Sequence, residues 1–200
     1  AIDSDLYNGE EKYMSGTIKV SDATIKDFNN VGWGSITFDE GFSYSSNVAA
    51  TILSQRLGKE KLAAYYDKFG FGKKTGIKLP EEASGTINFN YATEIATAAF
   101  GQGITTTPIQ NIQALTTLAN DGVMLKPYII SKIVDSTTKE VIYESSREEL
   151  GQIVKKSTTD KMKTMMHDVV YSGKTDARYF KSSLVEVMGK TGTAQIANPN

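Results

Sequence analysis

Two short motifs contain residue types that could carry out chemistry together. The first, Lys190-Thr191-Gly192-Thr193, combines a cation, two hydroxyl groups and a position without a side chain. Such a set suits the binding of a carboxylate at the edge of a strand, because the glycine lets the backbone of a ligand come close. The same residue types are also typical of an edge strand without function, where threonine is favoured and lysine opposes aggregation. The motif by itself leaves both interpretations open.

The second motif, Ser45-Ser46-Asn47, lies just before an expected helix. Small polar residues in that place usually cap the helix, by accepting a hydrogen bond from its first turn. The order of the two motifs adds information, since S-x-x-K, S-D-N and K-T-G occur together in penicillin-recognising serine enzymes. Here an S-x-N precedes a K-T-G, with Ser46 in the place of the aspartate. This order favours one functional site over two unrelated local structures.

Helices and short strands must position these motifs. Capping signals and helically spaced apolar residues predict helices in five places: from Phe38 after the capping box of Thr37 and Glu40, from Val48 to Gly58, from Leu62 to Gly70, from Pro108 to Asn120, and from a Ser157 cap to Gly173. Turn residues at 136–139 between two β-rich runs predict a hairpin. The alternating residues 184–188 predict a strand that leads into the K-T-G motif. We expect short strands and loops over residues 1–36 and an ordered loop over 73–90.

Composition limits the classes of function. The 200 residues are 40% hydrophobic and 22% charged with a net charge of −1, which predicts a packed core and excludes nucleic acid as the main partner. The expected elements indicate one α+β unit, or part of one. Cysteine is absent and His167 is the only histidine, so neither a thiolate nucleophile nor a metal site built on these residue types is expected. We expect no cofactor, and a lysine as the base. No apolar run is long enough for a membrane anchor, and the first residues lack the basic character of a signal peptide.

Together with further stretches, the motifs resemble the transpeptidase domain of class B penicillin-binding proteins, the monofunctional D,D-transpeptidases of bacterial cell division. The similar stretches are Gly32–Gly34, Phe100–Ile104, Thr107–Gln110, Ala119–Gly122 and Gly189–Gln195. They lie within residues 32–195, so we expect one partial transpeptidase domain over residues 1–200 and no second domain. The resemblance implies an α+β fold like that of penicillin-binding proteins and serine β-lactamases. This chain would hold mostly its helical part and the K-T-G strand of an antiparallel sheet.

One family motif is missing from its expected place. The family carries its nucleophilic serine in an S-x-x-K motif upstream of the S-x-N, and residues 1–44 contain no such motif. The chain's one S-x-x-K is Ser136–Lys139, which lies downstream in the expected hairpin turn, and we interpret it as turn chemistry. The resemblance therefore implies an internal fragment that lacks the nucleophile segment and is inactive alone.

The resemblance implies the cross-linking of peptidoglycan stem peptides by acyl transfer to serine, with β-lactams acylating the same serine. Three residues match the family's catalytic positions. Ser45 would relay a proton to the leaving group, and Asn47 would hold the substrate peptide and the active-site lysine. Lys190 would supply positive charge near the carboxylate of the substrate.

Four further residues match the family's substrate-binding positions. Thr191 occupies a position where the family accepts serine or threonine, and Gly192 keeps the strand open. Thr193 would offer its hydroxyl to the substrate carboxylate, and the backbone N–H of Gln195 would be one donor of the oxyanion hole. The expected partners are the stem peptide, β-lactams, the missing nucleophile segment and divisome proteins that include a glycan polymerase. The expected location is the outer face of the bacterial plasma membrane, with an upstream anchor.

Two other classes of function stay open. A non-catalytic module could use the K-T-G edge to hold a peptide or a β-lactam reversibly. A D,D-carboxypeptidase or a serine β-lactamase would need a deacylating water, and no residue can be assigned to that water from the sequence.

Overall fold

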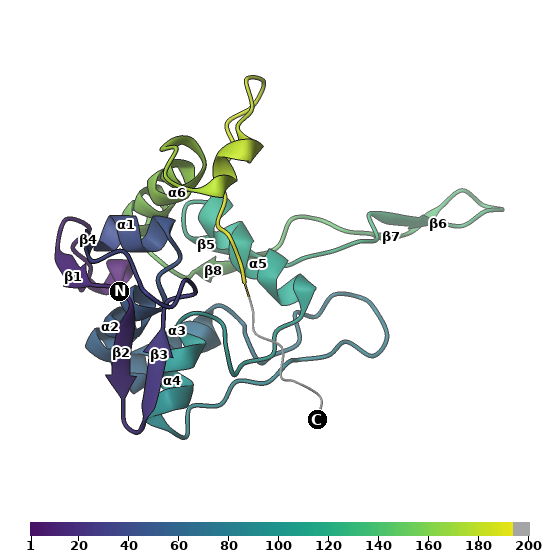
Figure 1. Cartoon of the computed structure of the whole chain (residues 1–200). Helices are drawn as coiled ribbons and strands as arrows, with labels where there is room; N and C mark the ends of the chain where they lie inside the picture. Colours follow the sequence, from purple (N-terminus) through teal and green to yellow (C-terminus); the bar gives the residue numbers. More distant parts are fainter. Residues whose placement is uncertain (194–200) are drawn as a thin grey trace, which may run out of the picture. The chain divides into compact units, whose positions relative to one another are not determined.

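The computed structural model describes residues 1–193, which fall into two compact units (Figure 1). Unit 1 comprises Ala1–Ala63, Asn88–Ile104 and the chain from Asp160 onward, and unit 2 comprises Ala64–Ile87 and Thr105–Thr159. Helices α3 (Lys59–Lys68) and α6 (Lys156–Tyr171) contribute residues to both units. Both candidate motifs lie in unit 1.

Unit 1 begins with short strands, as the sequence predicts. After the 3-10 turn Ile2–Ser4, β1 (Lys12–Met14) pairs antiparallel with β4 (Ser35–Thr37). Between them, β2 (Thr17–Val20) and β3 (Ala23–Lys26) form a tight hairpin, visible side by side in Figure 1. Because β3 ends at Lys26, Asp27 directly follows the hairpin.

The helices of unit 1 follow from local capping signals. Helix α1 (Phe38–Ser43) begins at the predicted capping box, in which Thr37 and Glu40 each accept from the backbone of the other. Helix α2 (Asn47–Leu57) is capped by the hydroxyl of Ser46 and ends at Gly58, as predicted. A further 3-10 turn, Asp176–Phe180, follows α6.

One expectation for the helices needs correction, and one helix had no expectation at all. Helix α6 begins at Lys156, so Ser157 lies inside its first turn and is not the cap. Helix α4 (Ala92–Ala98) was not predicted, because its alternating alanine and threonine residues show no amphipathic spacing. The signal for α4 is Glu94, whose carboxylate accepts from the backbone N–H of Asn90 and of Tyr91 ahead of the helix.

The largest core cluster of unit 1 lies under α1. Phe38 is 1% exposed, its ring stacks on that of Tyr13 at 4.8 Å, and Val48 and Ala49 of α2 pack in the same cluster. Burial of this aromatic pair fixes α1 and α2 against the first strands. The junction between the two helices, which carries Ser45 and Ser46, is therefore held on a rigid base.

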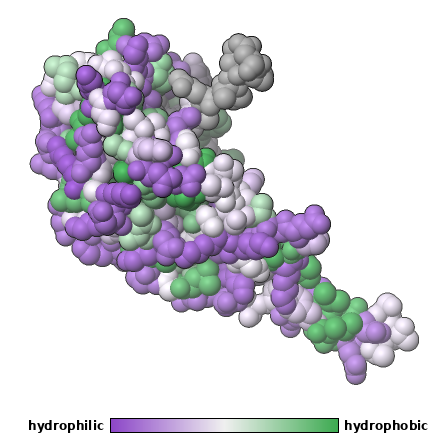
Figure 2. Space-filling model, turned by 90° about the horizontal axis from the view of Figure 1, so that it is seen from below, coloured by the Kyte–Doolittle hydropathy of each residue, from purple (hydrophilic) through white to green (hydrophobic). Residues whose placement is uncertain are grey.

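Unit 2 is built around α5 (Pro108–Ala119), which begins at the predicted Thr107 cap. Strand β5 (Val123–Leu125) pairs with β8 (Glu149–Gln152), and β6 (Lys132–Val134) pairs with β7 (Val141–Glu144) in the predicted hairpin. Within unit 2, this hairpin extends away from α5 (Figure 1), and Figure 2 shows green hydrophobic side chains along it. The large apolar residues of β6 and β7 are exposed: Ile133, Val134, Val141 and Ile142.

The strand predicted at residues 184–188, with its continuation into the K-T-G motif, does not appear in the described part of the chain. The residues alternate as in a strand, but a strand also needs a neighbour that completes its hydrogen-bond ladder. Every ladder within residues 1–193 joins two other strands. The segment is tied to α6 instead, where the N–H of Gly189 donates to the carbonyl of Met166 at 3.2 Å. The described residues thus hold the helices and small antiparallel strand pairs of the expected α+β fold, but no strand at 184–193.

Candidate active site

A tight turn joins α1 to α2 and presents the first motif. The N–H of Ser45 donates to the carbonyl of Phe42 at 3.1 Å, and the N–H of Ser46 donates to that of Gly41 at 2.8 Å. Ser45 itself has a φ of +58°, in the left-handed region that residues with a Cβ seldom adopt. The junction of the two helices therefore holds Ser45 in a conformation that its surroundings must maintain.

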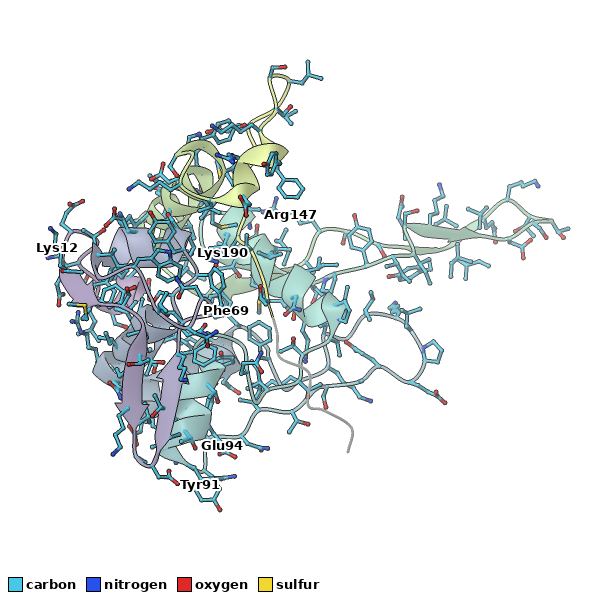
Figure 3. The ribbon with its side chains drawn as sticks, viewed as in Figure 1. Lys12, Phe69, Tyr91, Glu94, Arg147 and Lys190 are labelled. Carbon is cyan, nitrogen blue, oxygen red and sulfur yellow. The ribbon has the colours of Figure 1, made fainter. Side chains whose placement is uncertain are left out.

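The K-T-G motif meets Ser45 in unit 1, although it lies far along the chain. The Nζ atom of Lys190 donates a hydrogen bond to Oγ of Ser45, and Oγ of Ser45 lies 2.7 Å from Oγ1 of Thr191. The ammonium also lies 5.5 Å from the centre of the Phe42 ring, which belongs to α1. Figure 3 labels Lys190 on the last described segment of the chain. Three of the predicted site residues therefore form one cluster.

The other predicted site residues stand apart from this cluster. The side-chain amide of Asn47 donates to the carbonyl of Lys26 at 2.8 Å, at the end of β3. Gly192 faces open space, since a Cβ built there would meet no atom within 4 Å, and Thr193 is exposed. Gln195 lies outside the described residues.

The electrostatics of the cluster centre on Lys190. Partial desolvation lowers the pKa of its ammonium to about 8, because the charged form loses solvation there. A lysine with such a pKa can hold an anion when charged and can exchange a proton with a neighbouring hydroxyl. The arrangement of one such lysine and two hydroxyls can bind a carboxylate and pass a proton along Ser45.

Sequence reasoning missed one residue of the site, Asp27. This side chain is 1% exposed, and its carboxylate accepts hydrogen bonds from Ser46 and from the start of α2. A lone aspartate after a short strand carries no recognisable signal, since its burial depends on the packing of distant segments. The one indirect signal was Ser46, the middle residue of the S-x-N motif. It stands where S-D-N enzymes have an aspartate, which suggests that a carboxylate could come from elsewhere in the chain.

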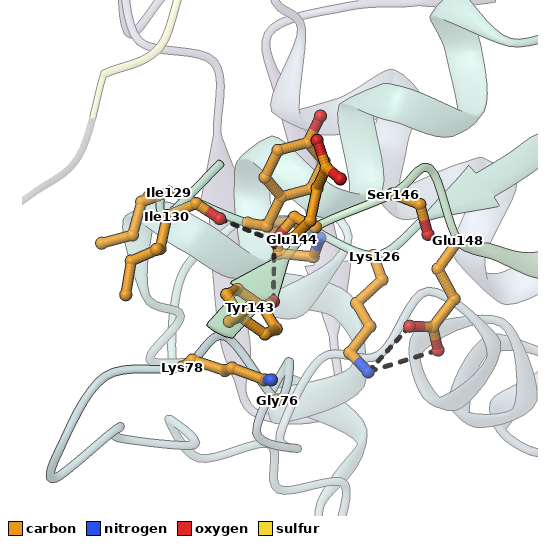
Figure 4. Close-up of a pocket in the computed structure, with 12 residues that line it drawn as sticks. Gly76, Lys78, Lys126, Ile129, Ile130, Tyr143, Glu144, Ser146 and Glu148 are labelled. Carbon is orange, nitrogen blue, oxygen red and sulfur yellow. Dashed lines mark hydrogen bonds and ion pairs between the residues drawn. The ribbon is translucent and has the colours of Figure 1, made fainter. Parts of the chain in front are cut away.

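Unit 2 has a pocket of its own, at the base of the β6–β7 hairpin (Figure 4). Its volume is about 260 Å³. The ammonium of Lys78 lies 3.8 Å from the centre of the Tyr143 ring, and Lys126 pairs with Glu148 at 3.0 Å. None of the predicted site residues lines this pocket, so it is separate from the Ser45 cluster.

No helix in residues 1–193 combines the length and the apolar character that crossing a bilayer requires.

Comparison with known proteins identifies the family. The model of the penicillin-binding protein transpeptidase domain matches residues 1–200. The chain is 35% identical to Stage V sporulation protein D of Bacillus subtilis over 189 residues, which cover 93% of this chain and 29% of that protein. It is 28% identical to peptidoglycan D,D-transpeptidase MrdA of Acinetobacter baumannii, over 86% of this chain and 27% of that protein.

A solved structure supports the same family. Penicillin-binding protein 3 of Mycobacterium tuberculosis, in complex with ampicillin, superposes with a TM-score of 0.87 at 29% identity, over 99% of this chain and 45% of that one. The chain thus spans less than a third of the length of the two curated relatives and less than half of the solved chain. Because the family model matches residues 1–200, the chain belongs to the family of penicillin-binding protein transpeptidase domains.

Proposed function

We propose that residues 1–200 are part of one transpeptidase domain of a class B, division-type penicillin-binding protein. The whole protein would cross-link peptidoglycan stem peptides by acyl transfer to serine, and β-lactams would acylate the same serine. The observation that carries this proposal is the contact of Lys190 with the Ser45 hydroxyl, which joins the S-x-N and K-T-G motifs. The name of the Acinetobacter relative and the ampicillin complex of the Mycobacterium protein support the reaction and the inhibitor class.

The chemistry proposed for the cluster has two parts. Lys190, in its charged form, attracts the terminal carboxylate of the stem peptide, and Thr193 adds a hydroxyl donor to that carboxylate. The Ser45 hydroxyl, in contact with both Lys190 and Thr191, relays a proton to the amine that leaves when the peptide bond breaks. Three further roles follow the family pattern: Asn47 holds the substrate peptide, Gly192 leaves room for its backbone, and the N–H of Gln195 completes the oxyanion hole.

We propose that the nucleophilic serine lies outside residues 1–200. Ser136 fits a turn better than a nucleophile, because Lys139 donates to its backbone carbonyl at 2.7 Å and not to its hydroxyl. An S-x-x-K segment on the same domain would have to place its serine beside the Ser45 cluster. Stem peptides, divisome proteins with a glycan polymerase, and a location at the outer face of the bacterial plasma membrane complete the proposal.

The test is acylation of the complete protein, including its S-x-x-K segment, by a fluorescent penicillin. We expect one covalent adduct on that serine, and a Lys190→Ala variant that reacts about 10- to 10²-fold more slowly, the usual range for the loss of a charged hydrogen-bond donor. Lys12→Ala, on the exposed edge strand β1 (Figure 3), is the matched control and should react normally. Reversible binding without a mass change would favour a binding module, and rapid turnover of the penicillin would favour a β-lactamase.

A further inference from the structure

The left-handed backbone of Ser45 needs contacts that hold it. A residue with a Cβ keeps such a conformation only where its surroundings determine it. The two backbone hydrogen bonds from Ser45 and Ser46 to α1 close the turn, but neither involves a side chain. A further contact to the junction, through the Ser46 side chain, comes from Asp27.

The Asp27 carboxylate binds three donors at the junction. Its Oδ1 accepts from Oγ of Ser46 at 2.8 Å and from the N–H of Val48 at 3.1 Å, and its Oδ2 accepts from the N–H of Gly16 at 2.7 Å. Hydrogen bonds to a charged acceptor are stronger than those between neutral groups. The start of α2 also favours a negative charge, because its N–H groups point toward it. Asp27 therefore ties the S-x-N motif to the loop after β1.

The hydroxyl of Ser46 both donates and accepts a hydrogen bond in this arrangement. Its single hydrogen goes to Asp27, while its oxygen accepts from the N–H of Ala49 at 3.1 Å as the cap of α2. A hydroxyl with one donor and one acceptor bond so placed has a fixed direction. Ser46 directly follows Ser45. Fixing the Ser46 side chain therefore also restrains the peptide bond between the two residues, and with it the direction of the Ser45 side chain.

The backbone around Gly16 is shaped for this contact. Gly16 has a φ of +109°, and a Cβ on Gly32 would collide with the backbone of Gly16. The two segments approach this closely because neither has a side chain at that point. Gly16 is also held beside Asp27 by its own backbone, because the N–H of Asp27 donates to the carbonyl of Gly16 at 2.9 Å.

We propose that Asp27 is a positioning residue that acts through Ser46 to aim the Ser45 hydroxyl at Lys190 and Thr191. The inference rests on the proposed function of that cluster. It also accounts for Ser46 in the middle of the motif, since the carboxylate that S-D-N enzymes carry there comes in this chain from position 27. Asp27 touches no substrate and carries no proton in the reaction.

The test uses four variants of the complete protein: Asp27→Ser, Ser46→Asp, the double exchange of both, and Ser54→Ala. Ser54 is a matched control, because it is buried on the same helix and its hydroxyl donates to the carbonyl of Thr51 at 2.8 Å, away from the motif. For each variant, the rate constant of acylation by a fluorescent penicillin is separated from the dissociation constant of the non-covalent complex. Amide hydrogen exchange of the peptide that covers residues 41–48 is measured in the same samples.

We expect Asp27→Ser to slow the acylation step at least about tenfold with a nearly unchanged dissociation constant, because the loss lies in the transition state. Ser46→Asp should be as slow, since two carboxylates then face each other, and the double exchange should recover much of the rate because it restores one carboxylate and one hydroxyl. Exchange at residues 41–48 should rise in both single variants and fall again in the double exchange. Ser54→Ala should change neither quantity.

Three results would overturn the inference: normal acylation in Asp27→Ser, a double exchange no better than the single variants, or unchanged exchange at residues 41–48. The failure of the proposed function has a different signature, since the unmutated protein would then form no adduct at all. In that event the exchange measurement still decides whether Asp27 holds the Ser45 turn.

Discussion

The ammonium of Lys190 donates a hydrogen bond to the hydroxyl of Ser45, a residue 145 positions earlier in the chain. The contact joins the turn between two helices to a segment with no regular structure. It also places a lysine of lowered pKa beside two hydroxyls. The pKa of the lysine and the role of the contact can each be tested by experiment.

The protonation of Lys190 should set the pH dependence of acylation. Its pKa of about 8 means that the ammonium is charged below this pH and loses its proton above it. Because the charged form attracts the carboxylate of the substrate, the acylation rate should be level below about pH 8 and should decline as the pH rises through that value. Rates of penicillin acylation across this range provide the measurement.

Lys190→Arg is the control for this profile. A guanidinium stays charged throughout, so the variant, whatever its absolute rate, should show no decline between about pH 7 and 9. A decline shared by both proteins would assign the titration to another group.

Ser136 should have no part in the reaction. The turn is held by Asp135, whose carboxylate accepts from the N–H groups of Thr137 and Thr138 at 2.7 Å, and Lys139 has the left-handed φ of a turn residue, +65°. Ser136→Ala should therefore acylate at the normal rate, and peptide mapping after penicillin treatment should find position 136 unmodified in the unmutated protein. A penicillin adduct on Ser136 would refute our interpretation of the motif.

Phe38 should be the most sensitive apolar position of unit 1. It is 1% exposed, and it contacts the Tyr13 ring and the guanidinium of Arg56, 4.9 Å from its centre. Phe38→Ala should lower the free energy of unfolding by about 3–5 kcal/mol, since it removes a buried ring and leaves a cavity. Urea denaturation gives the value.

The control for Phe38 is a phenylalanine of the same unit that packs little. Phe180 is 70% exposed, so Phe180→Ala should change the free energy of unfolding by no more than about 0.5 kcal/mol. Equal losses for the two variants would show that the α1 cluster is not the core of the unit.

Gln110 should anchor the loop 73–90 to α5. Its side chain is fully buried and its amide donates to the carbonyls of Lys73 and Ser84, each at 2.6 Å. Gln110→Met keeps the volume but removes both donors, together with the oxygen that accepts from the N–H of Thr107 at 2.9 Å, so it should cost at least about 1–3 kcal/mol and speed hydrogen exchange in the loop. Ile112→Ala, on the exposed face of the same helix, should leave the exchange of the loop unchanged.

The parts of the fold that were predicted from the sequence depend on neighbouring residues. The capping boxes at Thr37 and Thr107 determine where α1 and α5 begin, and each uses residues within one turn. The strand expected before Lys190 failed for the opposite reason, since alternation along one segment does not supply a neighbouring strand.

The residues of the candidate site also fall into those that the sequence predicted and those that it did not. The order of the two motifs and the family resemblance pointed to Ser45 and Lys190, and the structure brings their side chains into contact. Asp27 escaped notice, because its role depends on a loop that folds back onto the start of α2. Buried polar partners of this kind have no period and no motif, so they are found only when the packing is known.

The distance along the chain between Ser45 and Thr191 also bears on the order in which the protein folds. The β2–β3 hairpin pairs Val20 with Ala23, and such local contacts form within microseconds. The hydroxyl contact of Ser45 with Thr191 closes a loop of 146 positions, and its entropy must be offset by structure that already exists. We therefore expect the hairpins and helices to form first and the cluster around Lys190 to assemble last, so that a chain still emerging from the ribosome would have a core well before it has this site.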